Sequence, residues 1–170
     1  PSYVRRQQAY FEKKNGQGVI DDFYECIRLY QGYVKPYVLA YKTFYFYRQY
    51  EDAAGILKRV KEAGLESDEL KLYQFKIQRA TMTGREHWLK TLEEVTKFKE
   101  EYFSKKNERE KDGEKEENQT VESDLEDPEE LFMEIALLHW NVDDTDAALK
   151  AVDEGISLYG DKTGLVWLKA

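Results

Sequence analysis

The sequence predicts an all-α fold built from antiparallel helix pairs that stack in chain order. Apolar residues recur at spacings of three and four, which is the helical period. The chain of 170 residues contains only three prolines, and strand-like alternation of apolar and polar residues is scarce. The pattern of residues 3–28 recurs at residues 37–62, an offset of 34. A period of this length indicates a repeated helix pair that cannot bury its apolar face alone.

Start and stop signals support the individual helices. Gly64 follows the fourth helix, where glycine tolerates the left-handed conformation, and Ser67 is placed to cap the fifth helix. Asp127 and Pro128 form the clearest start signal, with Asp127 as the cap and Pro128 in the first turn. The predicted helices cover residues 3–13, 18–31, 36–49, 51–63, 68–82, 85–103, 128–141 and 145–158, and a ninth begins near residue 164.

Three segments follow from this pattern: helix pairs over 1–103, an acidic insert over 104–127, and a fourth pair with the start of a further helix over 128–170. The insert holds only two apolar side chains, Val121 and Leu125. It cannot bury enough apolar surface to offset the entropy of ordering, so we expect a disordered loop. A charged continuation of the preceding helix is the alternative reading for its first residues.

The acidity of the chain belongs to this segment. Residues 104–130 contain five basic and twelve acidic residues, which accounts for most of the net charge of −8. The rest of the chain is nearly neutral, so we expect no direct binding of nucleic acid, which depends largely on phosphate neutralisation. Ser123, within the insert, has the acidic surroundings of an acidophilic kinase site.

Two units carry the same pattern of bulky, small and aromatic residues. The unit at 34–67 carries Tyr37, Ala40, Tyr41, Phe44, Ala53, Leu57 and Val60. The unit at 129–162 carries Phe132, Ile135, Ala136, His139, Ala148, Val152 and Gly155. Through these residues the pattern resembles tetratricopeptide repeats.

The resemblance implies a right-handed superhelical stack, an α-solenoid, and a role in binding proteins. The first unit fits less well because Arg6 and Gln7 stand where apolar residues belong, and the third fits with a shift of one residue. A related helical array, the half-a-tetratricopeptide repeats of RNA-processing factors, is the alternative.

Catalytic and metal-binding patterns are scarce. Cys26 stands at a buried motif position, and no metal-ligand spacing links His87 with His139. The sequence has no phosphate-binding glycine loop and no nucleophile elbow. We therefore expect no enzyme activity, no cofactor and no metal. It also has no secretory signal pattern and no apolar run of about 18 residues, which favours a cytoplasmic or nuclear protein.

The helix over 36–49 is unusually aromatic. Packing on two sides, as expected of a central helix in a stack, explains much of this character. The alternative is a concave groove for a partner, to which the resemblance assigns some of these residues. The expected partner-binding residues are Lys42, Tyr45, Phe46, Met133 and Trp140. Tyrosine and tryptophan are common anchors in protein interfaces.

The sequence therefore predicts a non-enzymatic scaffold or adaptor subunit. It would bind a peptide, a helix or a subunit through the groove or through a terminal apolar face around Trp167. One alternative is a subunit of an RNA-processing or other ribonucleoprotein assembly, and another is an auxiliary subunit that positions an enzyme. Because the last predicted helix is apolar and lacks a polar cap, we also expect the array to continue into further repeats of a longer chain.

Overall fold

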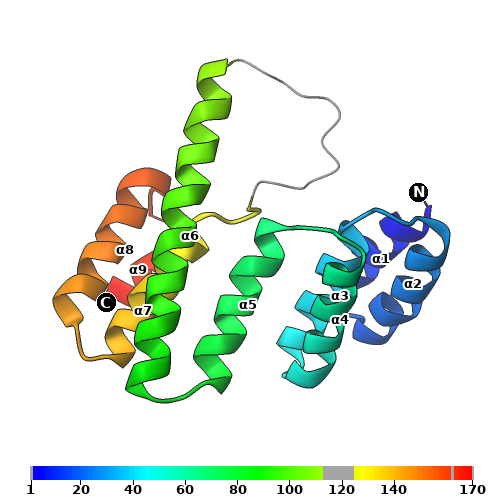
Figure 1. Cartoon of the computed structure of the whole chain (residues 1–170), viewed down its shortest axis with the longest axis horizontal. Coiled ribbons are helices and arrows are strands. Elements are labelled where there is room, and N and C mark those ends of the chain that lie inside the picture. The colour runs from blue at the N-terminus through cyan, green and yellow to red at the C-terminus, as the bar shows by residue number, and fades with distance from the viewer. Residues whose placement is uncertain (1, 113–124, 162, 170) are drawn as a thin grey trace. The chain divides into compact units, whose positions relative to one another are not determined.

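The computed structural model describes residues 2–112, 125–161 and 163–169, and within them every regular element is an α-helix (Figure 1). Helices that are consecutive in the chain pack antiparallel. The helices are α1 (Ser2–Glu12), α2 (Gly16–Leu29), α3 (Lys35–Phe46), α4 (Tyr50–Glu62), α5 (Asp68–Thr81), α6 (Arg85–Asp112), α7 (Glu129–Asn141), α8 (Thr145–Tyr159) and α9 (Thr163–Lys169).

All nine predicted helices are present, and most of their ends lie within three residues of the prediction. The exception is α6, which continues to Asp112 instead of ending at 103, so residues 104–112 are helical and do not belong to a loop (Figure 1). This part of the chain is rich in Lys, Glu and Arg, which are good helix formers. Glu101 and Lys105 have the i, i+4 spacing that adds helix stability.

Residues 113–124 of the insert, with Ser123, lie outside the described residues. At the end of the insert Leu125 is buried, and its N–H donates to the Tyr102 hydroxyl at 3.2 Å.

The described residues form two compact units, and the boundary lies within α5, between Tyr73 and Gln74. The N-terminal unit comprises α1 to α4 with the first residues of α5. The C-terminal unit comprises the rest of α5 with α6 to α9.

The core of the N-terminal unit comes from one face of each helix. In α2 this face carries Val19, Phe23 and Cys26, all fully buried. In α4 the residues 34 positions after Val19 and Cys26 are Ala53 and Val60, and they are buried as well.

Two polar residues that disturb the apolar pattern of α1 are both paired. Gln7 is fully buried, and its amide nitrogen donates hydrogen bonds to the carbonyl oxygens of Val19 (3.3 Å) and Pro36 (3.0 Å). Arg6 reaches the buried carboxylate of Asp22 at 2.6 Å. These bonds satisfy the Gln7 amide nitrogen and the Asp22 carboxylate, which would otherwise be costly to bury, whereas the Gln7 side-chain oxygen is buried without a hydrogen bond.

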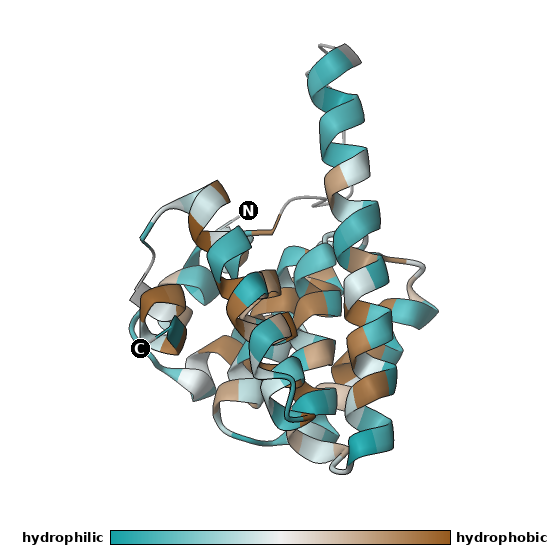
Figure 2. Cartoon of the chain, turned by 90° about the vertical axis from the view of Figure 1, so that its left-hand side faces the viewer, coloured by the Kyte–Doolittle hydropathy of each residue, from teal (hydrophilic) through white to brown (hydrophobic). Residues whose placement is uncertain are grey.

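The C-terminal unit is built around α7, whose residues Leu131, Phe132, Ala136 and Leu138 are almost completely buried. Hydrophobic and hydrophilic residues alternate along the helices of the chain, as the brown and teal bands of Figure 2 show. Two ion pairs join α7 to the second half of α5. Lys76 Nζ lies 2.8 Å from Glu130 Oε2, and Arg79 Nε lies 2.7 Å from Glu134 Oε2.

Four helices end in the same type of turn. After α1, α3, α4 and α7, one residue adopts positive φ, and the next residue donates its N–H to a carbonyl five residues back. This arrangement is the Schellman motif. The residue with positive φ is Gly64 after α4, and after the other three helices it is Lys14 (58°), Arg48 (57°) and Asp143 (62°), of which the first two are 34 positions apart.

The capping predictions hold in part. Gly64 has φ 67° directly after α4, and Ser67 Oγ accepts a hydrogen bond from the Leu70 N–H at 3.4 Å. The prediction that Asp127 caps α7 is wrong. Pro128 occupies the cap position with helical backbone angles, no side-chain hydrogen bond caps the helix, and the Asp127 carbonyl accepts the Glu130 N–H instead.

None of the helices in the described part of the chain combines the length and the apolar character needed to cross a membrane.

Gly155 of α8 tests the close packing of the C-terminal unit. A Cβ at this position would lie 2.9 Å from Phe132 Cβ and 3.1 Å from Leu165 Cδ1. We expect Gly155→Ala to lower the free energy of unfolding, because overpacking costs about 1–3 kcal/mol and exceeds the gain in helix propensity of about 1 kcal/mol.

Gly55 of α4 provides the matched control, since nothing lies within 4 Å of a Cβ built there. Gly55→Ala should raise the free energy of unfolding by about 0.5–1 kcal/mol. Urea unfolding followed by circular dichroism measures both variants. Stabilisation by both substitutions would contradict the close contact at Gly155.

Candidate protein-binding surface

The predicted partner-binding residues fall in the two different units. Lys42, Tyr45 and Phe46 belong to α3 in the N-terminal unit, whereas Met133 and Trp140 belong to α7 in the C-terminal unit.

Lys42 is buried, with only 5% of its surface exposed. Its Nζ lies 2.7 Å from Glu69 Oε2, and this carboxylate is also buried. The same Nζ lies 5.1 Å from the centroid of the Tyr73 ring, within the range of a cation–π contact. The charge of Lys42 is thus neutralised inside the protein. Lys42 is therefore not a surface contact residue itself, but it packs against the Tyr73 ring.

Tyr73 belongs to a cluster of four aromatic rings in the N-terminal unit. Tyr45 and Phe46 lie at the end of α3, and both contact Tyr73 of α5, with centroid distances of 5.2 and 6.2 Å. Phe11 at the end of α1 adds a fourth ring, 6.2 Å from that of Phe46. We call Phe11, Tyr45, Phe46 and Tyr73 the aromatic strip.

The strip combines a buried ring, Tyr73, with an exposed ring, Phe46. Tyr73 is 6% exposed, whereas Phe46 is 59% exposed although it contacts three other rings. The Tyr45 and Tyr73 rings meet edge to face at 89°, a favoured arrangement for aromatic pairs. An exposed ring held by its neighbours loses little conformational entropy when a partner covers it.

The turns at the ends of α1 and α3 hold this region together. The Tyr47 hydroxyl donates to the Lys14 carbonyl oxygen at 3.3 Å. The Tyr47 ring also fills the space beside Gly16, where a Cβ would lie 2.5 Å from a ring carbon. A side chain at position 16 would therefore displace the Tyr47 ring from this place.

The two predicted residues of α7 lie in different surroundings. Met133 packs against α9, because a Cβ at Gly164 would lie 2.7 Å from Met133 Cε. Trp140, at the last turn of α7, is 46% exposed.

Phe11, Glu69 and Tyr73 were missed by the sequence prediction. Phe11 could have been found, because it stands 34 positions before Tyr45 and so occupies the equivalent place in the first helix pair. Glu69 and Tyr73 carried no such signal, since the third pair departs from the 34-residue offset.

The described residues contain neither an exposed thiol nor a cluster of metal-binding side chains. Cys26 is fully buried, and burial raises the pKa of its thiol to about 11. A thiol with a raised pKa is a poor nucleophile near neutral pH. No three His, Cys, Asp or Glu side chains in the described part of the chain are arranged to hold a metal ion.

Comparisons of the chain with protein-family models, with curated proteins and with solved structures gave no match.

The ion pair beneath the strip gives a sharp stability prediction. Lys42→Met would leave the Glu69 carboxylate buried without its cation, so we expect a loss of about 3–5 kcal/mol in the free energy of unfolding. Urea unfolding measures this loss.

The double variant Lys42→Met/Glu69→Leu is the matched control, because it removes both charges. It should recover most of the lost stability. If the double variant were as unstable as the single variant, the loss would come from packing and not from an unpaired charge.

Alkaline pH should destabilise the N-terminal unit. Burial raises the pKa of Cys26 from 9.0 to about 11 and that of Tyr41 from 10.0 to about 12. Between pH 9 and 12 the unfolded chain loses protons that the folded chain keeps, so the free energy of unfolding falls as the pH rises.

Thermal unfolding between pH 8 and 12 measures this effect. In Cys26→Ala, which lacks the thiol, the loss of stability should begin about one pH unit higher, because in the unfolded chain the Tyr41 hydroxyl titrates with a pKa of 10.0 and the thiol with a pKa of 9.0. An unchanged profile in the variant would contradict the buried position of the thiol.

Proposed function

We propose that this protein is a non-enzymatic scaffold or adaptor that binds another protein through the aromatic strip, in the cytoplasm or the nucleus. The single observation that carries the proposal is Phe46, a large apolar ring more than half exposed and fixed by Phe11, Tyr45 and Tyr73. Protein interfaces are enriched in such aromatic anchors.

We further propose that the helix pairs are tetratricopeptide-like units of a right-handed superhelical stack. The turns after α1 and α3 support this reading, because Lys14 and Arg48 share positive φ at an offset of 34. The buried residues Val19 and Ala53 stand at the same offset. In an array of this kind each pair buries its apolar face against the next pair.

The exposed face of α9 supports a second route to the same function. Trp167 is 76% exposed and Val166 is 43% exposed, and they are neighbours on this short helix. A partner subunit that packed on α9 would cover both side chains. The protein would then join a complex end-on as well as through the strip.

Phe46→Ala tests the strip, since it removes the exposed ring and leaves the buried rings in place. Affinity purification of the full-length protein with mass spectrometry supplies the partner, and titration calorimetry measures its affinity. We expect Phe46→Ala to weaken binding by tenfold or more, which is typical of an aromatic anchor.

Tyr24→Ala is the control, because Tyr24 is similarly exposed at 52% but lies on α2, outside the strip. This variant should bind like the wild type. Full affinity in Phe46→Ala, or an equal loss in Tyr24→Ala, would refute the strip as the binding site. An end-on interface would then be revealed by loss of binding in Trp167→Ala.

A further inference from the structure

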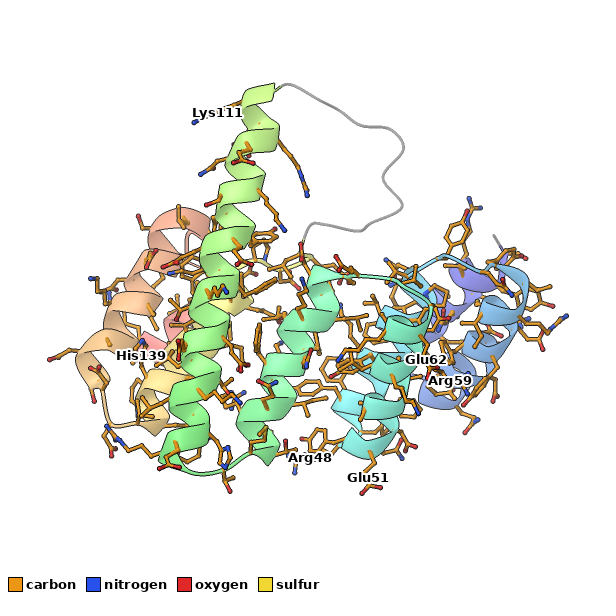
Figure 3. All side chains as sticks on the ribbon, in the orientation of Figure 1. Arg48, Glu51, Arg59, Glu62, Lys111 and His139 are labelled. Carbon is orange, nitrogen blue, oxygen red and sulfur yellow. The ribbon has the colours of Figure 1, made fainter. Side chains whose placement is uncertain are left out.

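The C-terminal unit carries a groove along α6 that is separate from the aromatic strip. Its volume is about 560 Å³, and six of its seven lining residues lie on α6 between Leu89 and Glu100. The seventh is His139 of α7 (Figure 3). The twelve helical residues from Leu89 to Glu100 span about 18 Å, or just over three turns. The groove therefore has the length of a short helix.

The apolar part of the groove follows a heptad seam. Leu89, Leu92 and Thr96 are spaced by three and four, as at the a, d and a positions of a coiled coil. Leu89 is 44% exposed, and neither Leu92 nor Thr96 is fully buried. The neighbouring face of α6, with Val95, Phe98 and Tyr102, packs into the core of the unit. The seam lies beside this buried face and extends the apolar surface of α6 out to the exposed Leu89.

The border of the seam is acidic. Glu86, Glu93 and Glu100 recur every seven residues at the e position beside the seam, and all three are exposed. In coiled coils the charges at the e and g positions select the partner helix and its orientation. Lys97 is the only basic residue that lines the groove. The carboxylates therefore favour a partner with cations along the edge of its apolar face.

His139 closes the other side of the groove. Its Nδ1 atom is buried and lies 4.0 Å from Asp144 Oδ2, beyond hydrogen-bond distance. The side chain as a whole is 22% exposed, so the exposed part belongs to the other ring atoms. The ring thus adds a flat surface with apolar carbon atoms that extends the seam sideways.

We propose that this groove receives an amphipathic helix of a partner protein, with Leu-like residues at heptad spacing and Lys or Arg residues along their flank. Basic residues seven positions apart on that helix are about 10 Å apart, which matches the spacing of Glu93 and Glu100. The groove shares no residue with the aromatic strip, so the proposal for one surface can be refuted while the proposal for the other stands.

Two synthetic peptides of 21 residues test the proposal by fluorescence anisotropy with the full chain. Both carry Leu at the a and d positions. One carries Lys at the flanking e and g positions, and the other carries Glu there. We expect the Lys peptide to bind the wild-type protein at least about tenfold more tightly than the Glu peptide, since like charges at these positions repel.

The variant Glu93→Lys/Glu100→Lys should reverse the preference for the two peptides. Glu101→Lys/Glu108→Lys is the matched control, with the same change of charge and the same spacing of seven at exposed positions of α6. It should keep the wild-type preference. Leu89→Asp should abolish binding of the Lys peptide while the circular dichroism spectrum stays unchanged.

Three results would overturn the proposal. The first is the absence of saturable binding of the Lys peptide to the wild-type protein. The second is an unchanged preference in Glu93→Lys/Glu100→Lys. The third is a reversed preference in the control variant, which would indicate non-specific attraction to an acidic protein. None of these results bears on the partner affinity of Phe46→Ala, so the two surfaces are tested independently.

Discussion

The ion pair between Lys42 and Glu69 is the interaction on which the candidate binding surface depends. Both side chains are almost completely buried and their charged atoms lie 2.7 Å apart. Burying two charges is costly, and the cost is offset only where they pair with good geometry. A shift of α5 along α3 would separate them, so the pair fixes the register of these helices. Tyr73, one turn after Glu69, is thereby held beneath Tyr45 and Phe46.

Helix α5 also forms ion pairs in the C-terminal unit. The first turn of α5 carries the acidic Glu69, whereas its second half carries Lys76 and Arg79, which pair with glutamates of α7. Acidic residues near the start of a helix and basic residues near its end agree with the helix dipole. Apolar packing binds the helices of each unit together, and the directional contacts position each part of α5 within its own unit.

The helices could be predicted from the sequence, because helical periodicity and the residues that start and stop a helix are local signals. The continuation of α6 was harder, since a charged segment without apolar residues has the composition of a loop as well as that of an exposed helix. The site was predicted less completely. The aromatic residues of α3 indicated Tyr45 and Phe46, but the burial of Lys42 depends on Glu69, 27 residues away. Periodicity identifies the face of a helix and not the residue that will meet it.

The position of Lys42 can be measured directly by nuclear magnetic resonance of the wild-type protein. With Nζ 5.1 Å from the Tyr73 centroid, the Lys42 side-chain methylene protons should be shifted upfield by the ring current and should show nuclear Overhauser effects to the Tyr73 ring. Its ammonium protons should exchange slowly with water because the group is buried. Random-coil methylene shifts, with no contact to Tyr73, would contradict the buried ion pair and the aromatic strip that rests on it.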